Sequence, residues 1–297
     1  MVDGLMEHST EMVTLFNCLT IDAKSTGYEY VGFFGCVAPV GQIMNLKMVG
    51  VSISADGSFV GGLAGVNRGV ISNCEVLGDI DGGDFTGGLV GLNTAGSSVI
   101  SDSLTRINVK APELVGGLVG VNKGSVVRCA TSGSVSGTSC VGGLIGDNTT
   151  ALTVSDCYSL CTISGHEFVG GIAGENSGNI LYSYAAGRVD GNDFAGALVG
   201  EDHDPDFVSC FWDSNINSDV NGIGNGSDPN VVGLTTVQMQ QRSTFTDAGW
   251  DFINVWDIGE NQTYPFLRTH LPSDINKDDK TNFYDIAILA GHWLDEK

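Results

Sequence analysis

One short motif occurs seven times between residues 30 and 202: an opening residue followed by Val-Gly-Gly-Leu-x-Gly-x-Asn or a close variant. Successive copies begin 26 to 29 residues apart, and a period of this size is typical of a solenoid, in which each repeat forms one turn. Within a copy, apolar residues alternate at a spacing of two, which is the period of a β-strand. The copies open at Tyr30, Phe59, Phe85, Leu114, Cys140, Phe168 and Phe194.

Equivalent residues of successive turns are expected to stack at about 4.8 Å along the axis of such a solenoid. We therefore expect the opening residues to form an aromatic and apolar row in the interior. A second interior row is aliphatic: Leu63, Leu89, Leu118, Leu144, Ile172 and Leu198. A third row can hydrogen-bond from amide to amide: Asn67, Asn93, Asn122, Asn148 and Asn176. The predicted fold is all-β, a right-handed parallel β-helix (β-solenoid) of about eight rungs over residues 1–212, with a partial first rung.

Five of the eight cysteines fall in one further column, which also accepts leucine and serine. This pattern favours free, buried thiols used as small apolar fillers over a disulfide framework. Cys129 and Cys157 lie in adjacent rungs, where the strand spacing also falls within the Cα range of a disulfide, so a bond between these two is the alternative. The column holds Cys18, Leu46, Cys74, Ser103, Cys129, Cys157, Ser183 and Cys210.

The Gly-Leu-x-Gly core of the repeat, as in Gly62-Leu63-Ala64-Gly65, resembles the GLUG motif. The resemblance covers residues 12 to about 212 and implies a β-solenoid of a large bacterial surface or secreted protein, but no activity. Some GLUG proteins carry a metallopeptidase, which needs the zinc motif His-Glu-x-x-His. His166-Glu167-Phe168-Val169-Gly170 lacks the second histidine, so that enzyme is not expected here.

The composition agrees with an extracellular or cell-surface location. The formal net charge of −22 disfavours nucleic acid and anionic membrane surfaces as partners and favours divalent cations. No run of 18 apolar residues is present, so no membrane span is expected. The first residues do not resemble a signal peptide, and because Cys18 already lies in the repeat column, we expect the N-terminus to be incomplete.

Residues 213–271 break the period and are expected to form a cap and linker. Thr235 or Thr236 can cap a short helix there. Three tryptophans, Trp212, Trp250 and Trp256, are expected to close the end of the core, because the last rung of a solenoid otherwise exposes its interior and an unpaired strand edge. The alternative is that they form a platform for carbohydrate.

Residues 272–297 contain the spacing of a calcium-binding loop of the EF-hand type. Oxygen-bearing side chains occupy loop positions one, three, five, nine and twelve, and position seven can offer its backbone carbonyl. Apolar residues then recur at helical spacing from Phe283 to Leu294. A solvated acidic turn is the alternative. The predicted Ca²⁺ ligands are Asp274, Asn276, Asp278, Lys280, Asn282 and Asp285.

This segment is similar to one repeat of a dockerin, over residues 273–294. A dockerin has two such repeats and glycine at position six of the loop, whereas this sequence has one repeat and Asp279. The resemblance implies attachment to a cohesin-like or cell-envelope protein. The function predicted first is therefore a non-catalytic, adhesin-like or scaffolding rod with a calcium-dependent C-terminal attachment module.

The second functional hypothesis is a carbohydrate-active or glycan-binding protein that acts on extracellular polysaccharide. It uses either the tryptophans or the cluster Glu201-Asp202-His203-Asp204-Pro205-Asp206, where carboxylates beside a histidine could act as acid and base. This cluster replaces the asparagine position of the last rung, so divergence toward the cap explains it equally well.

Overall fold

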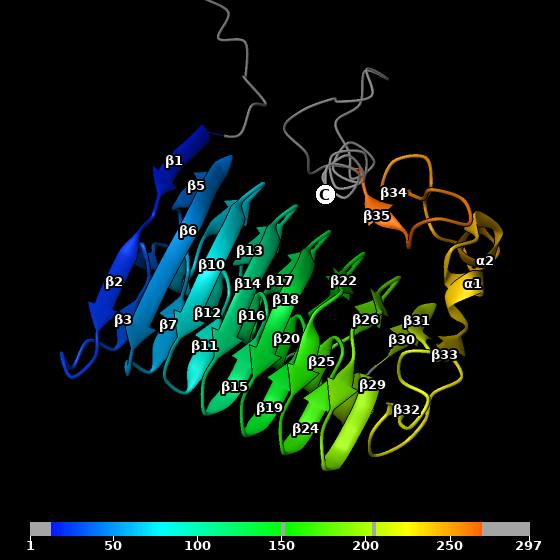
Figure 1. Cartoon of the computed structure of the whole chain (residues 1–297). Helices are drawn as coiled ribbons and strands as arrows, with labels where there is room; N and C mark the ends of the chain where they lie inside the picture. Colours follow the sequence, from blue (N-terminus) through cyan, green and yellow to red (C-terminus); the bar gives the residue numbers. More distant parts are fainter. Residues whose placement is uncertain (1–12, 150–151, 204–205, 269–297) are drawn as a thin grey trace, which may run out of the picture.

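The computed structural model describes residues 13–149, 152–203 and 206–268. They form a parallel β-solenoid of about seven turns, in which the strands of successive turns lie side by side along the axis (Figure 1). Three parallel sheets of 12, 14 and 7 strands run along this axis. Because each complete turn contributes one strand to the seven-stranded sheet, the expected eight rungs are not confirmed.

The strands of each sheet are as follows. The first sheet contains β1 Val13–Asn17, β2 Thr20–Ala23, β6 Leu46–Ala55, β10 Glu75–Asp81, β14 Leu104–Lys110, β18 Ala130–Ser136, β22 Tyr158–Ser159, β23 Thr162–Ser164, β27 Tyr184–Ala185, β28 Val189–Asp190, β31 Cys210–Asp213 and β33 Val231–Leu234. The second sheet contains β3 Tyr30–Val31, β4 Phe34–Val37, β7 Phe59–Gly61, β8 Ala64–Asn67, β11 Phe85–Gly87, β12 Val90–Asn93, β15 Glu113–Gly116, β16 Val119–Asn122, β19 Ser139–Gly142, β20 Ile145–Asn148, β24 Glu167–Gly170, β25 Ala173–Asn176, β29 Asp193–Asp202 and β32 Asn221–Ile223. The third sheet contains β5 Gln42–Met44, β9 Val70–Ser72, β13 Val99–Ser101, β17 Ser125–Val127, β21 Val154–Ser155, β26 Ile180–Leu181 and β30 Phe207–Val208.

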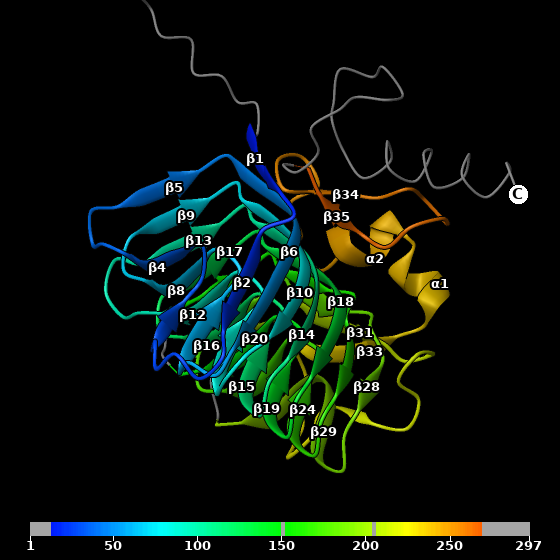
Figure 2. The same ribbon diagram turned by 60° about the vertical axis from the view of Figure 1, so that its left-hand side comes forward.

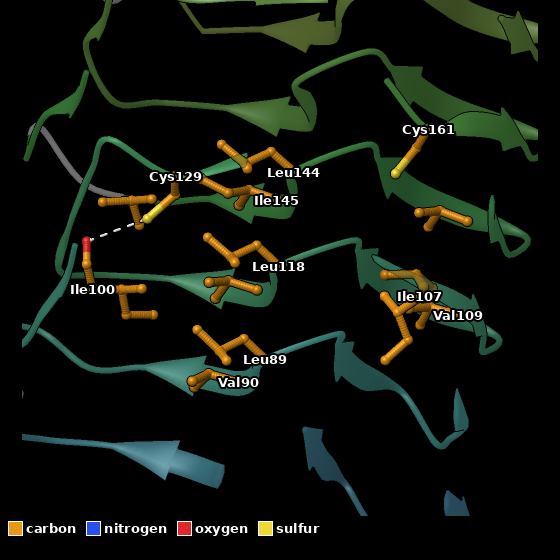
Figure 3. Packing of buried hydrophobic residues seen from close by; sticks show 14 of the residues in the cluster. Leu89, Val90, Ile100, Ile107, Val109, Leu118, Cys129, Leu144, Ile145 and Cys161 are labelled. Atoms are coloured by element: carbon orange, nitrogen blue, oxygen red, sulfur yellow. Dashed lines mark hydrogen bonds between the residues drawn. The ribbon is translucent and has the colours of Figure 1, made fainter. Parts of the chain in front are cut away.

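The interior is filled by stacked aliphatic side chains, as the repeat predicts. All six residues of the expected aliphatic row, from Leu63 to Leu198, have no exposed surface. Figure 3 shows Leu89, Leu118 and Leu144 above one another, with Val90 and Ile145 beside them. Burying one such side chain stabilises the fold by about 1.5–3 kcal/mol, so this row is a major part of the core.

The Gly-Gly-Leu step lets one turn contribute two strands to the second sheet. These two strands approach so closely that a Cβ atom on Gly116 would lie 2.0 Å from the carbonyl oxygen of Val119. Only glycine fits there, because a side chain would overlap the neighbouring backbone. The repeated glycines therefore encode the close packing of β15 on β16 and of the equivalent strand pairs.

The expected asparagine row forms a continuous hydrogen-bonded ladder inside the solenoid. Its five asparagines are fully buried, and each side-chain amide donates to the next residue along the axis. Asp202 accepts from the last of them at 3.1 Å. The donor–acceptor distances are 2.9 Å for Asn67 to Asn93 and 2.8 Å for Asn93 to Asn122, Asn122 to Asn148 and Asn148 to Asn176.

The opening residues also stack, but on the outside, so their expected interior position is wrong. Tyr30 and Phe194 are 47% and 45% exposed and Cys140 alone among the seven is buried, whereas the next residue, such as Val60 or Val169, is buried in six of the seven copies. In the later turns the opening residue has a left-handed backbone, with φ near +50°, whereas Tyr30, Phe59 and Phe85 point outward without one. The ring centroids lie 5.6 Å apart for Tyr30 and Phe59, 4.8 Å for Phe59 and Phe85, and 5.5 Å for Phe168 and Phe194.

All eight cysteines are free thiols. Cys74, Cys129, Cys157 and Cys210 are buried in the expected column, and Figure 3 shows Cys129 directed toward the carbonyl oxygen of Ile100, 3.8 Å away. Cys18 is exposed, so its expected inward position is wrong. Burial raises the pKa of the Cys157 thiol well above its usual value, which keeps this thiol protonated and unreactive.

The parallel pairing continues past residue 212, since β31 pairs with β33 and β29 with β32. The chain then forms the short helices α1 Thr236–Met239 and α2 Arg242–Thr246 and the antiparallel pair β34 Trp256–Asp257 and β35 Phe266–Leu267. Thr235 is the N-cap of α1, in a capping box with Gln238, which confirms the predicted helix start.

This C-terminal segment lies against the outer face of the first sheet (Figure 2), not over the end of the core as expected. Its buried tryptophans cover an outward row of aromatic side chains. Trp256 Nε1 donates to Asp156 Oδ1 at 3.2 Å, and Trp250 Nε1 donates to the carbonyl oxygen of Ser209 at 3.0 Å. The physical reason is the row itself, because Tyr158, Tyr184 and Phe211 on β22, β27 and β31 would otherwise expose a wide apolar surface.

Candidate functional site

Three acidic side chains occupy one row on the second sheet, in the last turns of the solenoid. Asp147 on β20 pairs in register with Glu175 on β25, and Glu175 pairs with Glu201 on β29. Neighbouring parallel strands lie about 4.8 Å apart, so the three carboxylates are close neighbours. In the earlier turns the same row is largely apolar: Cys36, Val66, Leu92 and Val121.

His203 follows β29 and brings an imidazole to this row. Its Nε2 atom lies 2.9 Å from Glu175 Oε1 and 3.9 Å from Glu201 Oε2. The hydrogen bond to Glu175 raises the pKa of His203, because it stabilises the protonated ring. The half-exposed imidazole thus partly neutralises two carboxylates from successive turns.

Burial, and then repulsion by Glu175, raises the pKa of Asp147 to about 7. Lys123 and His203 oppose this shift by attraction. A carboxyl group that titrates near neutral pH can exchange a proton under the conditions in which most enzymes act. The row therefore combines a carboxyl with a raised pKa, two further carboxylates and an imidazole.

Cys140 faces the acidic row from β19. It is an opening residue, and it replaces the large side chain that most other turns carry at this position. Its Sγ atom lies 3.5 Å from Glu175 Oε2 and is largely buried. Burial raises the pKa of this thiol to about 12, so it is protonated beside the carboxylate.

A second cluster lies at the start of β24 and β29. Glu167 and Asp193 pair in register, and His166 Nδ1 lies 4.0 Å from Glu167 Oε1. Both side chains of the latter pair are about half exposed. One ligand atom from each of these three residues lies within 4.8 Å of the others, but solvent screens the charges more than in the first cluster.

The predicted Ca²⁺ ligands lie outside the described residues, so that site remains a prediction. They are Asp274, Asn276, Asp278, Lys280, Asn282 and Asp285.

Of the predicted cluster from Glu201 to Asp206, the structure brings Glu201 and His203 together and leaves Asp202 to end the asparagine ladder. Residues 204 and 205 lie outside the described residues. Sequence reasoning missed Asp147 and Glu175 as their neighbours. The signal was present, because the residue before the asparagine position of the motif, which Asp202 occupies in the last copy, is acidic in three consecutive copies, at positions 147, 175 and 201.

The tryptophans do not form an exposed platform. Trp250 and Trp256 are 4% and 0% exposed, and Trp212 is half-buried against Gly222 and Gly233. A carbohydrate platform needs an accessible ring face, which neither of the two buried rings offers. Trp250 and Trp256 hold the C-terminal segment on the solenoid instead.

The fold defines the protein as a β-solenoid repeat protein. In sequence, the chain is 33% identical over 113 residues to a protein of Evansella cellulosilytica whose name describes it as a Gly-rich membrane protein. The match covers 35% of this chain and 12% of that protein, so the chain spans only a small part of its relative. No known family model and no solved structure matches the chain. Within the described residues, no helix is long and apolar enough to cross a membrane.

Proposed function

We propose that the protein is a non-catalytic rod of the cell surface or extracellular space, which binds partners through the outer faces of its solenoid. The observation that carries this proposal is the division between the interior and the surface. The interior is filled by aliphatic side chains and the asparagine ladder, so only the outer rows of stacked side chains are available for recognition. Adhesin-like and scaffolding proteins need such an extended, regular surface.

The C-terminal segment supplies the attachment in this proposal. Asp274, Asn276, Asp278, Asn282 and Asp285, with the carbonyl group of Lys280, would bind Ca²⁺ and order the following helix. The partner would be a cohesin-like or cell-envelope protein. The name of the Evansella relative refers to a membrane, which agrees with a role at the cell envelope.

A pull-down from envelope and secreted fractions tests this proposal, with the intact chain and Asp285→Ala compared with and without calcium. The proposal predicts a partner that is retained only by the intact chain in calcium. Equal retention of the partner by Asp285→Ala would contradict attachment through a calcium-dependent C-terminal segment. A matched control is Asp228→Ala, an aspartate of the loop between β32 and β33 that lies far from the tail in sequence.

The acidic row supports a second candidate, a polysaccharide-degrading activity. The raised pKa of Asp147 beside the Glu175 side chain resembles the pairing of two carboxyl groups in glycoside hydrolysis. Release of sugar from a polysaccharide panel that disappears in both Asp147→Asn and Glu175→Gln would establish it. If the intact chain releases sugar from none of these polysaccharides, the non-catalytic rod is favoured over this second candidate.

A further inference from the structure

Two glutamates and a histidine, residues of the kinds that bind metals, lie together on the outside of the last turns, far in sequence from the predicted calcium loop. One ligand atom each from Glu175, Glu201 and His203 lies within 4.8 Å of the other two. In a tetrahedral site with bonds of about 2 Å, ligand atoms are about 3.3 Å apart. The distances of 2.9 and 3.9 Å from His203 Nε2 to the two carboxylates are already close to that spacing.

We propose that Glu175, Glu201 and His203 bind a zinc-type transition-metal ion. This inference goes beyond the proposed rod function and does not depend on the C-terminal segment.

The charge balance of the row favours a bound cation. Three carboxylates follow one another on consecutive turns, at Asp147, Glu175 and Glu201, and the imidazole of His203 supplies one positive charge when protonated. Lys123 attracts the Asp147 end of the row. A divalent ion between Glu175 and Glu201 would neutralise the stacked charges that repel one another in this register.

The row of opening residues that faces the carboxylates carries a small side chain beside Glu175. At the opening positions, stacked aromatic rings occupy Phe59 and Phe85 in the early turns and Phe168 and Phe194 in the late turns. Between these two stacks, Cys140 places a small side chain next to Glu175, with its sulfur 3.5 Å from the carboxylate. The aromatic row is thus interrupted beside the proposed ligands.

The donor set selects the class of metal. Imidazole nitrogen with carboxylate oxygen suits zinc and its neighbours, whereas calcium prefers oxygen ligands alone, as in the predicted C-terminal loop. His203 must lose its second ring proton before Nε2 can bind a metal, so binding releases a proton. Zinc is therefore expected to bind here and calcium to bind the tail.

Zinc titration of the metal-free full chain against a chromophoric chelator, with calcium in excess, tests the site. His203→Gln and Glu201→Gln are each expected to weaken zinc binding at least about ten-fold, a loss typical even of groups that only support a ligand. Cys140→Phe, which extends the aromatic row, is expected to weaken it as well. Thermal melting without zinc, alongside the zinc-induced rise in Tm, separates lost binding from lost folding.

Two variants serve as controls and are expected to keep the affinity of the intact chain. His166→Gln removes the histidine of the second cluster, and Asp285→Ala removes a ligand of the predicted calcium loop while leaving every residue of the row unchanged in sequence. Unchanged zinc affinity in both His203→Gln and Glu201→Gln would overturn the proposal, as would an equal loss in His166→Gln. Because Asp285→Ala reports on the attachment role alone, failure of the metal site and failure of the proposed function are distinguishable.

Discussion

Replacing Asn122 with alanine is expected to cost more stability than any surface change in the chain. The side chain makes four hydrogen bonds inside the solenoid: it donates to Asn148 Oδ1 and to the carbonyl oxygen of Gly124, and it accepts from Asn93 Nδ2 and from the Gly124 amide. It has no exposed surface. The alanine variant leaves four buried polar groups without these partners.

Each buried group that loses its partner costs about 1–3 kcal/mol, and water entering the space left by the amide offsets part of this. We therefore expect the free energy of unfolding to fall by about 3–5 kcal/mol. Urea unfolding followed by circular dichroism measures it, with an unchanged m value showing that the same surface is exposed on unfolding.

The matched control is Asn108→Ala. Asn108 also bonds to the turns on both sides, donating to Asp79 Oδ1 at 2.9 Å and accepting from Ser134 Oγ at 2.8 Å, but this ladder is exposed to solvent. Its loss is expected to cost less than about 1 kcal/mol, because water replaces the partners. Equal costs for the two variants would refute the reasoning that burial gives the interior ladder its weight.

Asp147→Asn is expected to stabilise the metal-free protein by about 1–2 kcal/mol at pH 8 and not at pH 4, in urea unfolding at both values. The pKa of Asp147 is about 7 in the folded protein and 3.8 in the unfolded chain, so the stabilisation by its protonated form is complete below pH 3.8 and is lost as the pH rises through 7. This shift corresponds to about 4 kcal/mol, which we reduce because solvent partly screens the group. A benefit equal at both pH values would contradict this origin. Gly116→Ala is expected to lower stability by about 3 kcal/mol through overpacking, whereas Gly226→Ala, where a Cβ meets nothing within 4 Å, changes Tm little; equal shifts would exclude close approach as the cause. Trp256→Ala is expected to cost about 3–5 kcal/mol and to shift the fluorescence of Trp250 to the red as the C-terminal segment loosens, and an unshifted spectrum would show that the segment stays in place.

The repeat alone predicts the strands, the aliphatic row and the asparagine ladder, because a fixed period stacks equivalent residues of successive turns on one another along the axis. It does not predict which way the opening residue points. The buried residues of a copy are three positions apart across the Gly-Gly step, as at Val60 and Leu63, so a spacing of two counted back from the leucine places the opening residue on the wrong side. The stacking of the opening residues was predicted correctly, but the face of the sheet on which they stack was not.

The candidate metal site and the place of the C-terminal segment were harder to predict for a different reason. His203 meets Glu175, which belongs to the preceding copy of the motif, so the pair becomes visible only when the copies are aligned as stacked turns. Trp250 and Trp256 were expected to close the end of the core, but their partners Tyr158, Tyr184 and Phe211 occur once per turn, and the equivalent positions of earlier turns carry other residue types, Leu104 and Ala130. This outward row is aromatic in the later turns only, so the repeat as a whole does not reveal it.

The lateral position of the C-terminal segment determines how the molecule would carry mechanical load. The segment is joined to three successive turns, through Asp156, Tyr184 and Ser209, and the described chain leaves it at Arg268. Tension applied through Arg268 therefore enters the solenoid from its side and is shared among these turns, instead of peeling the last strand from the end. Leu234 of the final strand β33 also packs against this segment, whereas β32 pairs with β29 and lies outside this path.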